Sequence, residues 1–230
     1  IEYKDSVLSS YIDLREGAVS YLGPKPVIIG DGNQLAISYT TVLEHVQAGV
    51  GNDTVIGNSE NNEIYTYDGD DLVFSGEGAD LVCAGGGNNI VDFSEQSAAS
   101  DVLIFDADCV LRGFTEVYGF DQIATDTRLR DKLDFSALDA KRVDIRPQDV
   151  LLTGTQNQNL ASDILSKSHA TTFEIASGYV FVSALNAETG SAQHFYHVET
   201  ASEGYQTNEF CRIYGANVDM NFWTDLSFIV

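Results

Sequence analysis

Residues 48–92 divide without a gap into five blocks of nine: AGVGNDTVI (48–56), GNSENNEIY (57–65), TYDGDDLVF (66–74), SGEGADLVC (75–83) and AGGGNNIVD (84–92). A fixed-period recurrence is typical of a repeat architecture, and each block is predicted to be a turn followed by a short strand. Two columns define the blocks. The sixth position always has a short oxygen-bearing side chain: Asp53, Asn62, Asp71, Asp80 and Asn89. The eighth is always β-branched and is predicted to fill the interior: Val55, Ile64, Val73, Val82 and Val91.

Glycines at the second and fourth positions let each turn curl so that its carbonyl groups point inward. These glycines are Gly49, Gly51, Gly69, Gly76, Gly78, Gly85 and Gly87. Calcium takes about 6–8 oxygen ligands, so a turn with one Asp supplies roughly half a shell and two turns are needed per ion. If two blocks make one coil, the pairs are Asp53 with Asp71, Asp71 with Asn89, and Asn62 with Asp80. Asp71 is then the one sixth-position Asp expected to contact two ions. A polar solenoid without metal is the alternative.

The blocks resemble the RTX nonapeptide G-G-x-G-x-D-x-U-x, a calcium-binding repeat. Four flanking segments occur in the order found in the C-terminal β-roll module of serralysin-type secreted metalloproteases, over about residues 10–140. They are Ile12-Asp-Leu-Arg-Glu-Gly-Ala, Val42-Leu-Glu-His-Val, Gly51-Asn-Asp-Thr-Val-Ile-Gly-Asn and Asp131-Lys-Leu-Asp-Phe-Ser-Ala-Leu. The resemblance implies an all-β fold, a parallel β-roll flanked and capped by antiparallel strands in a sandwich-like arrangement.

The resemblance also extends the set of expected calcium ligands beyond the five blocks. Glu44 lies nine residues before Asp53 and is implied as a first ligand, with an ordinary surface glutamate as the alternative. Asp121 and Asp131 are implied to close a last site, whereas Asp126 and Asp134 are predicted to be turn or cap residues. Because Asn62 and Asn89 replace Asp, their turns are expected to hold metal more weakly. The complete expected set is Glu44, Gly49, Gly51, Asp53, Asn58, Asn62, Gly69, Asp71, Gly76, Gly78, Asp80, Gly85, Gly87, Asn89, Asp121 and Asp131.

Charge favours cations as partners. The chain has 230 residues, of which 12 are Lys or Arg and 35 are Asp or Glu, for a net charge of −23. This balance argues against nucleic acid or an anionic membrane as partner. No Lys or Arg lies between Lys25 and Arg112, so the acids of that segment must be solvated or neutralised by bound cations. With 43% hydrophobic residues the chain can still form a core.

The remaining chain is predicted to be β-rich around the repeats. Three parts of one structural unit are expected: an N-terminal β flank (1–47), the roll (48–92) and a C-terminal β cap (93–230). Two strands, in Asp101–Asp108 and Val110–Phe114, are expected to cross the end of the roll, and residues 157–168 are expected to form a short helix. The acid-plus-apolar end at Asp225–Val230 resembles the C-terminal signal of type I secretion, with a last β-strand as the alternative.

Three cysteines are an odd number without CxxC spacing, which argues against a zinc site. Cys109 and Cys211 are interpreted as buried free thiols, with a disulfide between them as the alternative. Cys83 is expected to point away from the roll.

No catalytic motif is present: HExxH, GxSxG and a P-loop are all absent from the sequence. The chain also lacks an apolar run long enough for a transmembrane helix, and it begins without Met or a signal peptide, so an upstream part is expected to be missing. The favoured function is a non-catalytic extracellular module that folds on calcium after type I secretion. The alternative is an accessory module of a secreted protease, lipase or epimerase, with polysaccharide or self-association at the cell surface as further partners.

Overall fold

The computed structural model describes the backbone of residues 1–25, 33–121, 126–138, 140–143, 151–152, 172–175, 180–186, 192–201, 204–214 and 228–229. Side-chain surroundings are described for residues 1–25, 33–121, 126, 128–138 and 208–214. The helix expected at 157–168 lies outside these ranges. Among the described residues the chain is mostly strands with almost no helix, as an all-β fold requires.

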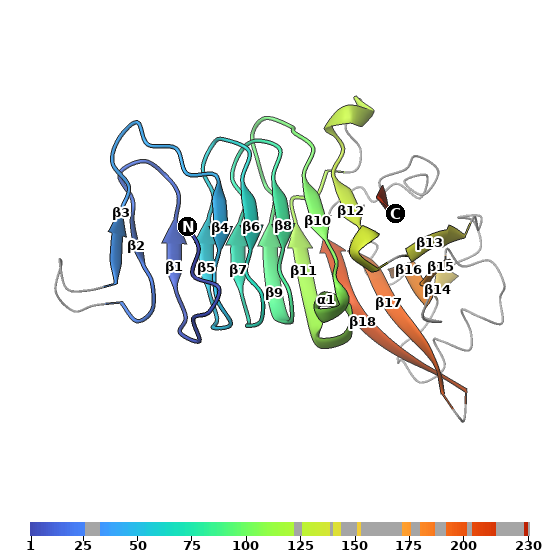
Figure 1. The fold of residues 1–230 in the computed structure, drawn as a ribbon. Helices are drawn as coiled ribbons and strands as arrows, with labels where there is room; N and C mark the ends of the chain where they lie inside the picture. The colour runs from blue at the N-terminus through green and yellow to red at the C-terminus, as the bar shows by residue number, and fades with distance from the viewer. Residues whose placement is uncertain are drawn as a thin grey trace.

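Short parallel strands alternate between two sheets along the repeat segment (Figure 1). The smaller sheet has six strands within the described ranges: β4 (His45–Gln47), β6 (Glu63–Tyr65), β8 (Leu81–Cys83), β10 (Val102–Ile104), β12 (Lys132–Asp134) and β19 (Phe228–Ile229). The parallel part of the larger sheet contains β1 (Tyr11–Asp13), β5 (Thr54–Ile56), β7 (Leu72–Phe74), β9 (Gly87–Asp92), β11 (Gly113–Tyr118) and β18 (Gly204–Tyr214).

Strands of alternate blocks pair in parallel, which confirms that two blocks make one coil. Val55 lies opposite Val73, and Val73 lies opposite Val91. On the other sheet Ile64 pairs with Val82. Parallel strands need a crossover, and here each crossover runs through a turn, a strand of the other sheet and a second turn.

The eighth-position column forms the core between the two sheets. Each of its members is 0–1% exposed: Ile12, Val46, Val55, Ile64, Val73, Val82, Val91, Leu103, Val117 and Leu133. Burying one Val or Leu side chain contributes roughly 1.5–3 kcal/mol. One interior residue per strand therefore provides the main apolar stabilisation of a coil that otherwise consists of polar turns.

The parallel stacking continues beyond the five blocks in both directions. Upstream, Ile12 pairs with Val55, so residues 5–13 stack on the first block in the same register. Downstream, Leu103 pairs with Val82 and with Leu133. The expectation that strands after Asp92 cross the end of the roll is therefore wrong. β10 stacks in register, and Val110 lies in α1 (Ala107–Arg112) instead of a strand. The segment 93–100 contains extra residues that lengthen one turn, and the pairing of the neighbouring strands stays in register.

Antiparallel strands continue the larger sheet at both ends. At the N-terminal end they are β2 (Val19–Tyr21) and β3 (Gln34–Ala36). At the C-terminal end β18 is followed by β17 (Ala192–Ala201), β16 (Val180–Asn186), β15 (Thr172–Ile175) and β13 (Ala140–Val143), with β14 (Leu151–Leu152) against β16. Two short 3₁₀ turns, η1 (Thr127–Leu129) and η2 (Ser136–Leu138), flank β12.

An aromatic cluster fills the C-terminal end of the core. Phe105 stacks on Phe135 at 5.1 Å between ring centroids and meets Phe210 edge-on at 5.3 Å. All three rings are buried. Because one comes from β18, the cluster joins the antiparallel strands to the last parallel coils.

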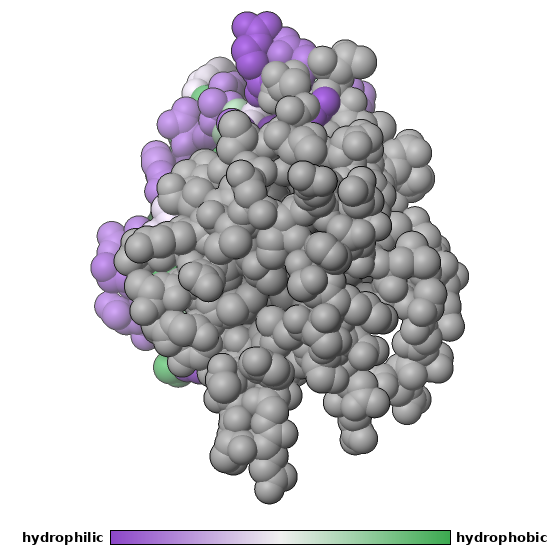
Figure 2. Space-filling model, turned by 90° about the vertical axis from the view of Figure 1, so that its right-hand side faces the viewer, coloured by the Kyte–Doolittle hydropathy of each residue, from purple (hydrophilic) through white to green (hydrophobic). Residues whose placement is uncertain are grey.

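The described surface at this end is mostly hydrophilic where it comes into view (Figure 2), in keeping with the acidic composition. In the part of the chain that the structure describes, no helix is long and apolar enough to cross a bilayer.

Candidate metal centre

The turns at the two ends of the strands stack into two rows of sixth-position residues. The first row contains Ser10, Asp53, Asp71 and Asn89, and the second contains Asn62, Asp80, Asp101 and Asp131. All eight side chains are at most 5% exposed. The sequence pattern thus places a carboxyl or amide oxygen inside each turn of the five blocks, although burying a charge is unfavourable unless something compensates it.

In the first row each backbone N–H donates to the side chain of the next coil. The N–H of Asp53 lies 2.7 Å from Oδ1 of Asp71, and the N–H of Asp71 lies 3.0 Å from Oδ1 of Asn89. The Asp53 carboxylate accepts from the N–H groups of Ser10 and Gly49. The predicted pairs of this row are therefore adjacent in space.

The second row repeats the arrangement and runs further than the nonapeptides. The N–H of Asn62 lies 2.7 Å from Oδ1 of Asp80, and the N–H of Asp80 lies 2.8 Å from Oδ1 of Asp101. Asp101 in turn donates to Asp131, whose other oxygen accepts the N–H of Asp121. Asp101 has a carboxylate on each side, so Asp71 is not the one sixth-position Asp flanked by two possible ligands.

Two carboxylate oxygens in these rows are buried without a hydrogen-bond partner in the described structure. They are Oδ2 of Asp71 and Oδ2 of Asp80. An unpaired buried carboxylate oxygen costs more than a neutral group, and buried charges in proteins are normally paired or bound to metal. The atoms available to bind a metal between these turns are all oxygen atoms, which is the ligand type that calcium prefers. The residues present therefore fit a calcium ion between neighbouring turns.

Backbone carbonyl groups approach the same spaces. A Cβ added to Gly69 would lie 2.3 Å from the carbonyl oxygen of Gly51, and one added to Gly87 would lie 2.1 Å from that of Gly69. Both glycines have positive φ, at 142° and 102°. Only glycine combines that conformation with so close an approach. The glycine column thus brings carbonyl oxygens of one turn against the next turn of its row.

The two Asn turns close differently from the Asp turns. Nδ2 of Asn89 donates to the carbonyl oxygens of Ala84 (3.0 Å) and Gly85 (3.3 Å). Nδ2 of Asn62 donates to Oδ1 of Asn58 at 3.1 Å. In both turns the amide N–H donates to oxygen atoms of its own turn, which a carboxylate cannot do. That these turns hold calcium more weakly than the Asp turns stays a prediction.

Burial raises the pKa of the acids in both rows. Loss of hydration raises the pKa of Asp71, Asp80 and Asp131 to about 7. The pKa of Asp101 rises to about 8, first because of burial and second because of the neighbouring Asp131 carboxylate. Without a cation these sites therefore favour the protonated form near neutral pH.

The second row gathers a further carboxylate that sequence spacing does not place there. Glu95, in the long turn after β9, has a buried Oε2 without a hydrogen-bond partner among the described groups, while its Oε1 accepts from Ala99. Burial and the nearby Glu77 and Asp121 charges act to raise its pKa. The Glu95 charge also acts to raise the pKa of both Asp80 and Asp101, so Glu95 is a candidate calcium ligand together with them.

Other expected residues are placed less favourably for metal. Glu44 precedes Asn62 in the second row, and its carbonyl accepts the N–H of Glu63, but its side chain is exposed. The amide of Asn58 donates to the carbonyl oxygens of Leu14 and Leu43.

The turn and cap roles expected of the remaining two acids are confirmed. Asp126 caps η1 by accepting from Arg128, and Asp134 accepts the N–H of Ser136.

Comparison with known families agrees with this geometry. Residues 47–82 and 56–91 each match the family model described as RTX calcium-binding nonapeptide repeat (4 copies). No curated protein matches the chain. The segment from Gln47 to Val91 therefore carries RTX calcium-binding nonapeptide repeats, and calcium is its cofactor.

Proposed function

We propose that this chain is a non-catalytic extracellular module that folds when calcium binds to the two rows, after export from the cell. The observation that carries the proposal is the buried, unpartnered Oδ2 of Asp71 and of Asp80. A calcium ion between turns neutralises these groups and supplies their missing partner. The resemblance of the flanking segments to serralysin-type modules supports a place at the C-terminal side of a larger secreted or surface protein.

Calcium-dependent folding follows from the small apolar content of each coil. Ordering a residue costs about 1–2 kcal/mol of backbone entropy, and most residues of a nonapeptide are polar or glycine. One buried side chain per strand offsets only part of this cost. Metal binding to a site that does not exist in the unfolded chain adds its free energy directly to folding.

The test is circular dichroism and differential scanning calorimetry of the purified chain with chelator, with millimolar calcium and with millimolar magnesium. We expect weak β structure and a marginally stable fold in chelator, and a cooperative, more stable fold in calcium. Magnesium should substitute poorly, because it demands a small octahedral shell. A spectrum and melting temperature that do not change when calcium is removed would contradict the proposal.

Export is proposed to depend on the C-terminal end and not on the repeats. The supporting observation is the acid-plus-apolar sequence of Asp225–Val230. Phe228 also pairs with Leu133 in the smaller sheet, so the same segment has a place in the folded module. Deleting 226–230 should retain the protein inside cells that carry a matching type I exporter, whereas Asp71→Ala should still be exported. Normal secretion of the truncated chain would contradict the export role and would leave the segment only its role as a β-strand.

A further inference from the structure

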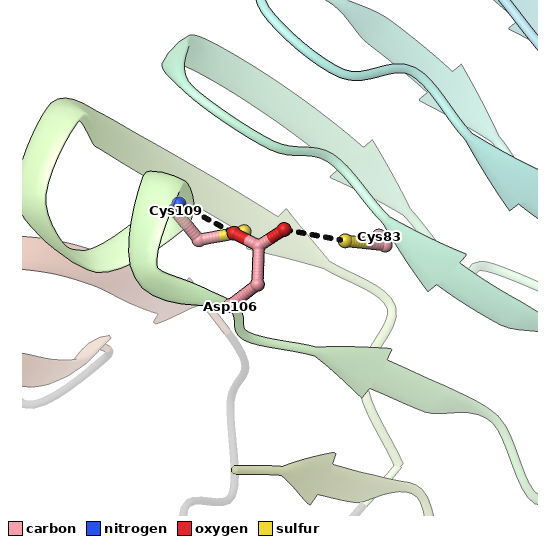
Figure 3. Close-up of side chains that lie close together, drawn as sticks. All are labelled: Cys83, Asp106 and Cys109. Atoms are coloured by element: carbon pink, nitrogen blue, oxygen red, sulfur yellow. Dashed lines mark hydrogen bonds between the residues drawn. The ribbon is translucent and has the colours of Figure 1, made fainter. Parts of the chain in front are cut away.

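Two thiols and a carboxylate meet outside the calcium rows, beside α1. Cys83 ends β8, Asp106 is the N-cap of α1, and Cys109 lies in the first turn of that helix. One ligand atom from each residue lies within 4.8 Å of the other two. Figure 3 shows the Asp106 carboxylate next to both sulfur atoms. Neither thiol is paired in a disulfide. Cys83 follows the interior residue Val82 on β8, so it faces away from the roll as expected, and it is nevertheless buried there.

The carboxylate of Asp106 is held in a fixed orientation. Its Oδ1 accepts the backbone N–H of Cys109 at 2.9 Å, which caps the helix. Its Oδ2 therefore faces Cys83, with 3.8 Å between that oxygen and Sγ. Cys109 is 1% exposed and Cys83 is 7% exposed. The three groups are thus pre-positioned by a cap and by the core, as a binding site requires.

The cluster opens on one side into a cavity of about 570 Å³. Cys83 and Asp106 line this cavity together with the carboxylates of Asp68, Asp108 and Asp134. Arg112 bridges Asp68 and Asp108, at 2.8 Å from each. The cavity therefore gives solvent or a small ligand access to Cys83 and Asp106, and Asp134 adds a further acidic residue to its lining.

We propose that Cys83, Asp106 and Cys109 bind one thiolate-preferring divalent cation of the zinc class, with the fourth coordination position open to the cavity. Binding converts two thiols to thiolates, forms two metal–sulfur bonds and one metal–oxygen bond, and releases two protons to solvent. Three protein ligands and one open position are a common arrangement for zinc. Soft sulfur ligands select zinc over calcium, so the site is chemically distinct from the oxygen-lined rows.

A disulfide between Cys83 and Cys109 is the competing use of the same thiols. It would require an external oxidant and a sulfur–sulfur distance of about 2 Å. It would also leave Asp106 without a role beyond capping. A fixed carboxylate oxygen within 4.8 Å of both sulfurs is what favours metal.

The test uses the full chain, saturated with calcium and reduced with a phosphine that does not bind metal. Cobalt(II) is added as a spectroscopic probe and then displaced with zinc. We expect one cobalt per chain with a near-ultraviolet thiolate-to-cobalt absorption that zinc abolishes. Cys83→Ser and Cys109→Ser should each lose that absorption or weaken binding by at least the roughly 10–100-fold known for outer-shell partners. Asp106→Asn should weaken binding while both thiolate bonds remain.

Cys211→Ser is the matched control. Cys211 is also a buried free thiol, at 0% exposure, and it is not part of the cluster. This variant should bind cobalt as the parent chain does. Protection of Cys83 and Cys109 from alkylation by zinc, located by peptide mass spectrometry of the unmutated chain, provides a second measurement if a variant does not fold.

Three outcomes would overturn the proposal. Cobalt binding that persists unchanged in Cys83→Ser would place the ion in the calcium rows. An unreduced protein two hydrogens lighter, with Cys83 linked to Cys109, would assign the thiols to a disulfide. Absence of both cobalt absorption and zinc protection would leave no site. None of these results depends on whether calcium drives folding, so failure of one proposal is separable from failure of the other.

Discussion

The backbone N–H of Asp53 donates to Oδ1 of Asp71 at 2.7 Å, although the two residues are 18 positions apart in sequence. The second oxygen of Asp71 is buried and has no hydrogen-bond partner in the described structure. One side chain therefore performs two tasks. Its first oxygen holds the preceding turn in register, and its second oxygen is placed to bind a cation or, without one, a proton.

Asp71→Asn should separate these two tasks. The amide keeps an oxygen for the N–H of Asp53 and removes the buried charge, as the natural Asn89 does. We expect the variant to be more stable than the parent in chelator, by about 1–3 kcal/mol given the raised pKa of Asp71. It should also gain less stability from calcium. Chemical denaturation with and without calcium measures both effects.

Asn89→Asp is the reciprocal control for that experiment. It adds a carboxylate next to Asp71 in the first row, so it should lower stability in chelator and increase the gain from calcium. Equal responses of the two variants to calcium would show that the sixth-position side chains do not bind the ion.

Gly87→Ala should disrupt stacking of the first row. Gly87 has φ of 102°, and an added Cβ would lie 2.1 Å from the carbonyl oxygen of Gly69. The left-handed backbone alone costs roughly 1–2 kcal/mol for a non-glycine residue, and the displaced carbonyl is itself a candidate calcium ligand. We expect both the melting temperature and the apparent calcium affinity to fall.

Gly86→Ala provides the neighbouring comparison. Its φ lies outside the left-handed region, and the nearest atom to an added Cβ is the end of the Asp68 side chain, at 2.8 Å, which can move. This substitution should change stability by less than Gly87→Ala. A larger effect at position 86 would contradict the importance of the carbonyl approach.

The strict ninefold spacing predicted the coil pairing and the interior column of the five blocks. The pairs Asp53–Asp71 and Asn62–Asp80 follow from that spacing alone, because two blocks return the chain to the same edge. The ninefold spacing no longer predicts the sixth-position residue where a turn changes length. Asp101 lies 21 residues after Asp80, because the segment 93–100 is longer than a block turn, and counting in nines from Asp80 therefore does not reach it.

A shorter signal could have located Asp101, which the expected ligand set lacks. Asp101-Val-Leu places an apolar residue two positions after an Asp, as the sixth and eighth positions of a block do, and the expected ligand Asp131 has the same pattern in Asp131-Lys-Leu. Ser10 and Glu95 carry no such signal. Ser10 enters the first row only through the pairing of Ile12 with Val55, and Glu95 only through the fold of its long turn.

Stability without calcium should increase on acidification. The folded-state pKa values of Asp71, Asp80 and Asp131 are about 7 and that of Asp101 is about 8, all above the ordinary value of 3.8. A raised folded-state pKa means that the folded chain binds more protons than the unfolded chain between these values. Stability is therefore lost as pH rises through about 7–8 and is recovered as pH falls toward 4.

Urea denaturation in chelator at several pH values between 4 and 8.5 would measure this trend. In saturating calcium the dependence should reverse, because protons compete with calcium for the same carboxylates. A calcium-free stability that is flat across this interval would mean that these acids are not buried in the folded chain.

Asp101→Asn should have the largest effect among the second-row substitutions. Asp101 is 1% exposed, accepts from Asp80 and donates to Asp131, so its carboxylate lies between two others. Replacing it with Asn removes a charge from the spaces on both sides while keeping the acceptor for Asp80. Isothermal titration calorimetry should show weaker binding in two calcium-binding steps, and chemical denaturation in chelator should show a more stable fold. Asp126→Asn is the control, because Asp126 pairs with Arg128 on the surface and lies outside both rows. If Asp101→Asn and Asp126→Asn titrate alike, calcium does not bind in the second row beyond Asp80, and the row ends with the nonapeptides.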